Sequence, residues 1–109
     1  MLVRTTESGT RSILAVEGEV DAHTAPQLKS AIAASLDRGT TELIVDLDQV
    51  TFMDSTGLGV LVGGLKGLRE VGGELRIVCT RRPILRILEI TGLDKVIPLY
   101  SGLAEATSV

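Results

Sequence analysis

The sequence predicts a single α/β domain built around one mixed β-sheet. Two strand-like segments joined by a polar turn open the chain, helical and strand-like segments alternate after them, and no repeat or linker interrupts this order. The chain of 109 residues is long enough for one core and too short for two, so we expect residues 1–109 to form one domain. Apolar residues at 44% and charged residues at 23% indicate a folded globular chain rather than a disordered one.

The strand-like segments are recognised by their apolar patterns. Residues 2–7 and 12–19 alternate apolar and polar side chains on either side of the polar turn Ser8-Gly9-Thr10-Arg11, which predicts a β-hairpin. Residues 43–47 are apolar and β-branched, as is typical of a central strand buried on both faces. Two further strands are expected at residues 74–79 and 96–99.

The first helix is expected between the hairpin and the central strand. Thr24 and Gln27 match a Thr-x-x-Gln capping box, and Pro26 suits the first turn because its missing N–H has no helical partner there. The helix should run to about Asp37, with Gly39 as its stop. Its core-facing residues are expected to be Leu28, Ala31, Ile32, Ser35 and Leu36. A third helix is expected from Pro83 to Gly92, and a weak terminal helix over residues 101–107.

The second helix, expected to start near Ser55 and to end at Gly72-Gly73, is unusually rich in glycine. Each interior glycine costs roughly 1 kcal/mol relative to alanine. Either this helix packs unusually close to its own sheet, or its outer surface is kept flat for another protein. The glycines concerned are Gly59, Gly63, Gly64 and Gly67, and the predicted core stripe is Leu58, Leu61, Val62, Leu65, Leu68 and Val71.

The composition argues against several classes of function. A net charge of −3 and 2% aromatic residues give neither a basic surface nor a stacking platform for direct contact with nucleic acid. The longest uncharged stretch, Ser55 to Leu65, is much shorter than the ~20 apolar residues of a membrane span, and the first residues lack a signal sequence, so we expect a cytoplasmic protein. One His and one Cys without metal-binding spacing predict no metal site, and Cys79 is expected to be buried in a strand.

The segment Asp54-Ser55-Thr56-Gly57-Leu58 is the candidate functional site. It lies where an apolar strand pattern gives way to a helix, and a phosphate at a helix start meets free backbone N–H groups and the positive end of the helix dipole. A nucleotide site is disfavoured because residues 46–53 separate the strand from Asp54 and no Gly-Lys-Ser/Thr follows. Nucleophilic catalysis by Ser55, with His23 as base and Asp21 or Asp54 to orient it, is disfavoured because the GxSxG elbow is absent.

Two interpretations of the hydroxyls at this site remain. Asp54, Ser55 and Thr56 are all good N-cap residues, so capping alone could explain them. Only one cap is needed, however, and the excess beside a glycine-rich helix favours a phosphorylation acceptor. Phosphate would add a charge of about −1.5 to −2 next to neighbouring carboxylates.

Several segments of the chain resemble the STAS domain of bacterial anti-sigma factor antagonists. The most specific is Phe52-Met53-Asp54-Ser55-Thr56-Gly57-Leu58-Gly59, and Gly18-Glu19-Val20-Asp21 with Thr24-Ala25, Val45-Asp46-Leu47 and Thr91-Gly92-Leu93 accompany it. The resemblance implies a sheet with helices packed mainly on one face. It also implies that the unphosphorylated chain binds an anti-sigma factor that is itself an ATP-binding serine kinase, and thereby releases the sigma factor. Phosphorylation would reverse this, and a phosphatase would reset the protein.

The resemblance also assigns roles to residues. Ser55 corresponds to the phosphorylated serine, with Thr56 as the alternative acceptor, and Asp21 corresponds to the family's carboxylate near the partner. The chain is then a regulator rather than an enzyme, needs no cofactor, and is a monomer or a weak dimer. The alternative is a non-switching adaptor subunit of a signalling or lipid-transport assembly. The expected partner-binding residues are Asp21, His23, Thr24, Asp54, Ser55, Thr56, Gly57, Leu58 and Gly59.

Overall fold

The first two strands form the predicted hairpin in the computed structural model, which describes residues 1–109. β1 pairs antiparallel with β2, and Gly9 in the turn between them has a φ of 61°. The remaining strands add in parallel to give one five-stranded mixed sheet in the order β1-β2-β3-β4-β5, which confirms the predicted fold class. The strands are β1 (Leu2–Ser8), β2 (Arg11–Val20), β3 (Glu42–Met53), β4 (Glu74–Val78) and β5 (Leu99–Tyr100).

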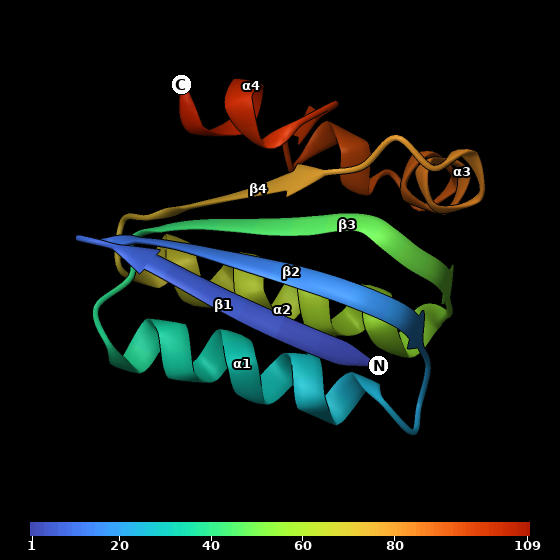
Figure 1. Ribbon diagram of the computed structural model, residues 1–109, viewed down its shortest axis with the longest axis horizontal. Coiled ribbons are helices and arrows are strands. Elements are labelled where there is room, and N and C mark those ends of the chain that lie inside the picture. Colours follow the sequence, from blue (N-terminus) through green and yellow to red (C-terminus); the bar gives the residue numbers. More distant parts are fainter.

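The two longest helices cover the same face of this sheet. Figure 1 shows α1 (Ala25–Asp37) and α2 (Ser55–Glu70) side by side beneath the strands. α3 (Arg82–Ile90) packs against β3, and a single 3-10 turn (Leu93–Lys95) follows it. α4 (Leu103–Thr107) lies on the opposite face, against β4 and β5. None of the helices combines the length and the apolar character that spanning a lipid bilayer requires.

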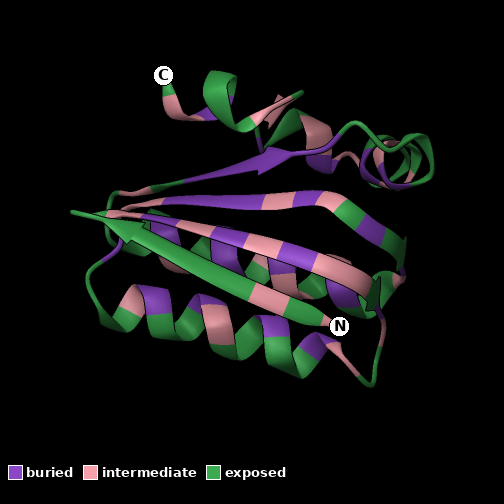
Figure 2. Cartoon of the chain, viewed as in Figure 1, coloured by how far each residue is buried: buried purple, intermediate pink, exposed green.

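The main hydrophobic core lies between the sheet and the pair α1 and α2. Figure 2 shows buried positions on the sides of both helices that face the strands, whereas most of β1 is exposed. Cys79 is a free residue of this core and is buried as predicted, although β4 ends one residue before it. The core includes Leu14 and Val16 of β2, Leu43, Val45 and Leu47 of β3, Leu28 and Ile32 of α1, Leu61 and Leu68 of α2, and Ile84 and Leu88 of α3.

The predicted length of β3 and the position of β5 are wrong. β3 continues beyond residue 47 to Met53 and stays paired with β2, although β4 ends opposite Asp46. Two register shifts in the β2–β3 pairing break the alternation of apolar residues that reveals a strand in sequence. β5 is limited to Leu99–Tyr100, because a turn occupies the residues expected to begin it.

The glycines of α2 serve different purposes. A Cβ added to Gly67 would lie 2.8 Å from Leu36 Cδ1 of α1, and one on Gly64 would lie 3.4 Å from two Ile32 carbons, so these glycines let the helices pack closely. Around Gly59 and Gly63 an added Cβ would meet nothing within 4 Å. The predicted close packing on the sheet is therefore wrong for Gly64 and Gly67, whose close neighbour is α1, and a surface kept flat for another protein stays a prediction for Gly59 and Gly63. The predicted core stripe also ends too late, because Val71 is 58% exposed.

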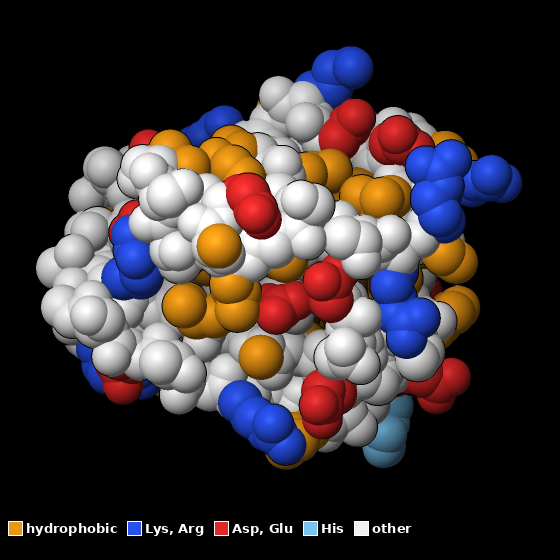
Figure 3. Space-filling model, turned by 45° about the horizontal axis from the view of Figure 1, so that its top comes forward, with side chains coloured by type: hydrophobic (Ala, Val, Ile, Leu, Met, Phe, Trp, Pro, Cys, Tyr) orange, Lys and Arg blue, Asp and Glu red, His pale blue; other side chains and the backbone are white.

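A charged cluster on the second face of the sheet holds α4 in place. Glu42 accepts hydrogen bonds from Arg11 and from Arg76, which is only 5% exposed. The same two guanidinium groups donate to the carbonyl oxygens of Thr107 and Ala106 at the end of α4. Beneath the helix, Ile44, Val78 and Ala106 form a small second core. Figure 3 shows this side of the molecule turned forward, with acidic and basic side chains around small hydrophobic areas.

Candidate functional site

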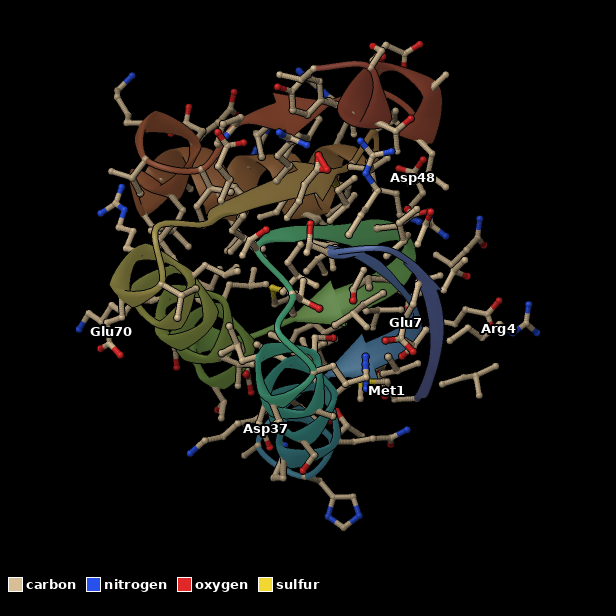
Figure 4. All side chains as sticks on the ribbon, turned by 90° about the vertical axis from the view of Figure 1, so that its left-hand side faces the viewer. Met1, Arg4, Glu7, Asp37, Asp48 and Glu70 are labelled. Atoms are coloured by element: carbon tan, nitrogen blue, oxygen red, sulfur yellow. The ribbon has the colours of Figure 1, made fainter.

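The candidate site lies where β2 and β3 end side by side. Val20 and Met53, the last residues of these parallel strands, are paired, and the N–H of Asp54 donates to the carbonyl of Val20 over 3.1 Å. The residues that follow, Asp21 and Asp54, therefore lie at the same edge of the sheet. Figure 4 views the opposite end of the molecule, where Asp37 and Glu70, the last residues of α1 and α2, are seen. The N-termini of both helices consequently point toward the site.

Asp54 is the N-cap of α2. Its Oδ1 accepts hydrogen bonds from the N–H groups of Thr56, at 2.9 Å, and Gly57, at 3.3 Å. None of these bonds uses the hydroxyl of Ser55, which is the first residue of the helix and is exposed. Asp54 therefore has the capping role, and the Ser55 hydroxyl forms no hydrogen bond that stabilises the helix start.

Asp21 organises the loop that leads into α1. Its Oδ1 accepts from the N–H groups of His23, at 2.9 Å, and Thr24, at 3.0 Å. The backbone hydrogen bond from Thr24 is the main reason that the pKa of the Asp21 carboxyl is lowered. All of these bonds reach Oδ1, so Oδ2 remains available to a partner.

The predicted Thr24–Gln27 capping box is wrong. Thr24 has a helical conformation (φ −100°, ψ −23°) and its side chain caps no N–H group of α1. Its hydroxyl instead lies 2.8 Å from the carbonyl oxygen of Glu19 and accepts from the N–H of Asp21 over 2.9 Å. The carboxylate of Asp21 does not cap α1 either, because the N–H groups of His23 and Thr24 that it binds precede Ala25, the first residue of the helix.

The structure also bears on the catalytic and nucleotide-binding interpretations. The imidazole of exposed His23 forms no hydrogen bond with Ser55 or with either aspartate, so no triad is assembled. Because β3 runs to Met53, Asp54 follows the strand directly, and the predicted separation of strand and site is wrong. A phosphate cradle is nevertheless disfavoured, because the carboxylate of Asp54 already occupies the N–H groups of Thr56 and Gly57.

A groove between α1 and α2 begins beside Ser55. It has a volume of about 600 Å³, and Thr56 lines it at the end near the site. The flat floor results from Gly59 and Gly63, whose missing side chains leave open space. The groove has no signal in the sequence other than these two glycines. The other lining residues are Ala25, Pro26, Lys29, Ile32, Ala33 and Leu36 from α1, and Val60 and Gly64 from α2.

Comparison with known proteins assigns the family. Residues 3–106 match the STAS domain. The chain belongs to the STAS domain family. The anti-sigma-B factor antagonist of Listeria monocytogenes is 43% identical over 84 residues, which cover 77% of this chain and 74% of the relative. The anti-sigma-B factor antagonist of Staphylococcus aureus is 40% identical over 87 residues, covering 80% and 81% of the two chains. An anti-sigma factor antagonist from Mycobacterium paratuberculosis has the same fold, with a TM-score of 0.90 and 33% identity over 98% of this chain and 91% of that one.

In this STAS domain the nine predicted partner-binding residues all lie in the turns after β2 and β3 or at the start of α2. They differ in accessibility. His23, Ser55, Thr56 and Gly59 are exposed, whereas Gly57 is buried. A Cβ on Gly57 would lie 2.8 Å from Val20 Cγ1 and 2.9 Å from Met53 Cγ, so this glycine sets how closely α2 approaches the strand ends. The partly buried residues are Asp21, Thr24, Asp54 and Leu58.

Proposed function

We propose that this STAS domain is an anti-sigma factor antagonist controlled by phosphorylation at Ser55. Unphosphorylated, it binds an anti-sigma factor serine kinase, which binds ATP itself, and the sigma factor is released. The observation that carries the proposal is the exposed Ser55 hydroxyl, which no hydrogen bond of the Asp54 cap uses and which lies beside the Asp21 loop. The names of the relatives at 43% and 40% identity support the antagonist role.

The switch is electrostatic. A phosphate on Ser55 stands at the positive end of the α2 dipole, which tolerates an anion, so the fold persists. Its charge of about −1.5 to −2 adds to those of Asp21 and Asp54, and the surface becomes repulsive and costly to desolvate for a partner that fits the unmodified form. A phosphatase restores binding. The chain itself acts in the cytoplasm as a regulator rather than an enzyme, without a cofactor, and as a monomer or weak dimer.

Substitution of Ser55 tests the switch. With the anti-sigma kinase of the same organism, Ser55→Asp is expected to weaken binding at least ~10-fold, and Ser55→Ala to bind like the wild type but accept no phosphate from ATP. Calorimetry measures the affinities and intact mass measures the phosphate. Thr56→Ala is the matched control and should be phosphorylated normally. Stoichiometric label on Thr56 in Ser55→Ala would show that the acceptor is wrong, and equal affinity before and after modification would favour the non-switching adaptor.

The groove gives a second prediction about the partner surface. Gly63 lies on its floor with no atom near enough to oppose a side chain, so Gly63→Val should leave the free energy of unfolding unchanged or raise it slightly. If the kinase packs across the groove, the same substitution is expected to weaken its binding about 10-fold, because the added methyl groups fill the contact surface. Titration of kinase into the folded variant measures this. Wild-type affinity would exclude the groove from the docking surface.

A further inference from the structure

The helix α3 carries arginines where its own structure disfavours them. Arg81 is its N-cap residue and Arg82 is its first residue, and no acidic residue accompanies them in the first turn. Cations are unfavourable at this end of a helix, because the dipole makes it positive. Arg86 follows Arg82 by four residues, so two like charges also lie next to each other on one side of the helix. Three arginines therefore oppose the local stability of α3.

No ion pair or side-chain hydrogen bond within the domain compensates for Arg82 and Arg86. The ion pairs of the chain involve Arg11, Arg38 and Arg76. Arg81 at least donates its Nε to the carbonyl oxygen of Asp48, at 2.8 Å, whereas Arg82 and Arg86 are exposed and form no side-chain hydrogen bond. Residues that weaken a helix and form no compensating interaction in the fold are typical of a surface that binds another molecule.

An exposed apolar residue continues the row of arginines. Ile90, four residues beyond Arg86, is 77% exposed, whereas Ile84 and Leu88 on the inner side of α3 are buried in the core. We call Arg82, Arg86 and Ile90 the basic stripe; it extends for about 12 Å along the helix. α3 lies at the right-hand end of the molecule in Figure 1, and Figure 3 shows basic and hydrophobic side chains next to each other at that end.

We propose that the basic stripe is a second docking surface for the anti-sigma kinase, occupied by an acidic segment of that protein. The inference rests on the proposed function. The basic stripe is too long to be filled by one phosphate. It fits a segment with two carboxylates about 6 Å apart, which pair with Arg82 and Arg86, followed by an apolar side chain that packs against Ile90. A membrane surface is a poorer fit, because the apolar face of α3 is already buried against the core.

The position of the stripe suits one partner that contacts both surfaces. α3 lies at the same end of the sheet as the turn from β3 to α2, as Figure 1 shows. At that end Asp21 and Asp54 follow β2 and β3, whereas the arginines belong to α3, which follows β4, so a partner with matching charges is favoured in one orientation. Phosphorylation changes the acidic side alone, and the basic stripe is a contact that the switch leaves intact.

Charge reversal tests the stripe. The variant Arg82→Glu/Arg86→Glu is expected to bind the kinase at least ~10-fold more weakly at low salt, with a smaller dependence of affinity on salt. Its melting temperature should change little, because carboxylates replace cations at the positive end of α3 but the like charges at positions 82 and 86 still repel each other. Lys66→Glu/Arg69→Glu on α2 is the matched control with the same change in net charge, and its affinity should change less than ~2-fold.

Each outcome decides the inference separately from the proposed function. Loss of affinity in the stripe variant but not in the control supports it, and the milder variant Arg82→Gln/Arg86→Gln should show an intermediate loss. Equal affinities, or equal losses in stripe and control variants, overturn it. A lower melting temperature of Arg82→Gln/Arg86→Gln also overturns it, because that variant removes the repulsion without adding like charges, so a loss would give the arginines a structural role. If Ser55→Asp abolishes binding while the stripe variants bind normally, the switch stands and the second docking surface is refuted.

Discussion

Glu42→Gln is expected to lower the free energy of unfolding by roughly 3 kcal/mol, because it removes the only carboxylate shared by two arginines on the second face of the sheet. Glu42 accepts from Arg11 Nε at 2.7 Å and from Arg76 Nη1 at 2.7 Å. Arg76 is buried, and in the absence of the Glu42 carboxylate its only remaining ion-pair partner is the exposed carboxylate of Glu74. Since both guanidinium groups also hold the last carbonyls of α4, this helix should loosen first. Urea denaturation at neutral pH measures the loss, and hydrogen exchange of residues 103–107 measures the loosening.

Acid titration provides the second half of this test. The hydrogen bond from Arg11 is the main reason that the pKa of Glu42 falls from 4.5 to about 2. Because the folded pKa lies below the unfolded one, the stabilisation is complete above pH 4.5 and is lost as the pH falls toward 2. The difference in the free energy of unfolding between the wild type and Glu42→Gln should therefore shrink as the pH falls from 4.5 toward 2. Glu7→Gln is the control, because Glu7 and Arg38 pair with side chains 47% and 39% exposed, and its loss should stay below ~1 kcal/mol. Equal losses of unfolding free energy in Glu42→Gln and Glu7→Gln would show that burial of Arg76 does not strengthen its pairing with Glu42.

The parts of the fold that depend on local chemistry could be predicted from the sequence. The hairpin follows from alternating residues around a glycine turn, and Gly39 and Gly92, with φ of 89° and 76°, end their helices as expected. α2 begins at Ser55 because Asp54 caps it. The site could be placed for the same reason, since Asp21 and Asp54 each follow a strand and parallel strands bring their ends together.

The errors arose where tertiary contacts override a local pattern. The end of β3 is stabilised by pairing with β2 across two bulges, which no window of the β3 sequence reveals. Thr24 matched a cap motif, but its hydroxyl lies 2.8 Å from the carbonyl oxygen of Glu19 and accepts from the N–H of Asp21, so it is turned away from the N–H groups of the helix. The groove could not be predicted either. It depends on which glycines of α2 face α1 and which face solvent, and that is set by the angle at which the two helices pack.

Gly57→Val is expected to be the most damaging substitution at the switch itself. Its Cβ would overlap Val20 and Met53, which are 0% and 2% exposed and belong to the strand ends that place Asp21 and Asp54. Overpacking of a buried contact should lower the free energy of unfolding by roughly 2 to 3 kcal/mol.

Gly63→Val is the matched control for Gly57→Val, because it makes the same exchange in the same helix at a position open to solvent, so that helix propensity cancels between the two. The difference between their denaturation midpoints therefore isolates the contact beneath Gly57. Since relief of the overlap must move the first turn of α2 away from the end of β2, Ser55 also shifts relative to Asp21. The folded fraction of Gly57→Val should then be phosphorylated more slowly than the wild type at saturating ATP. Equal midpoints for the two variants would show that α2 does not depend on close contact at Gly57.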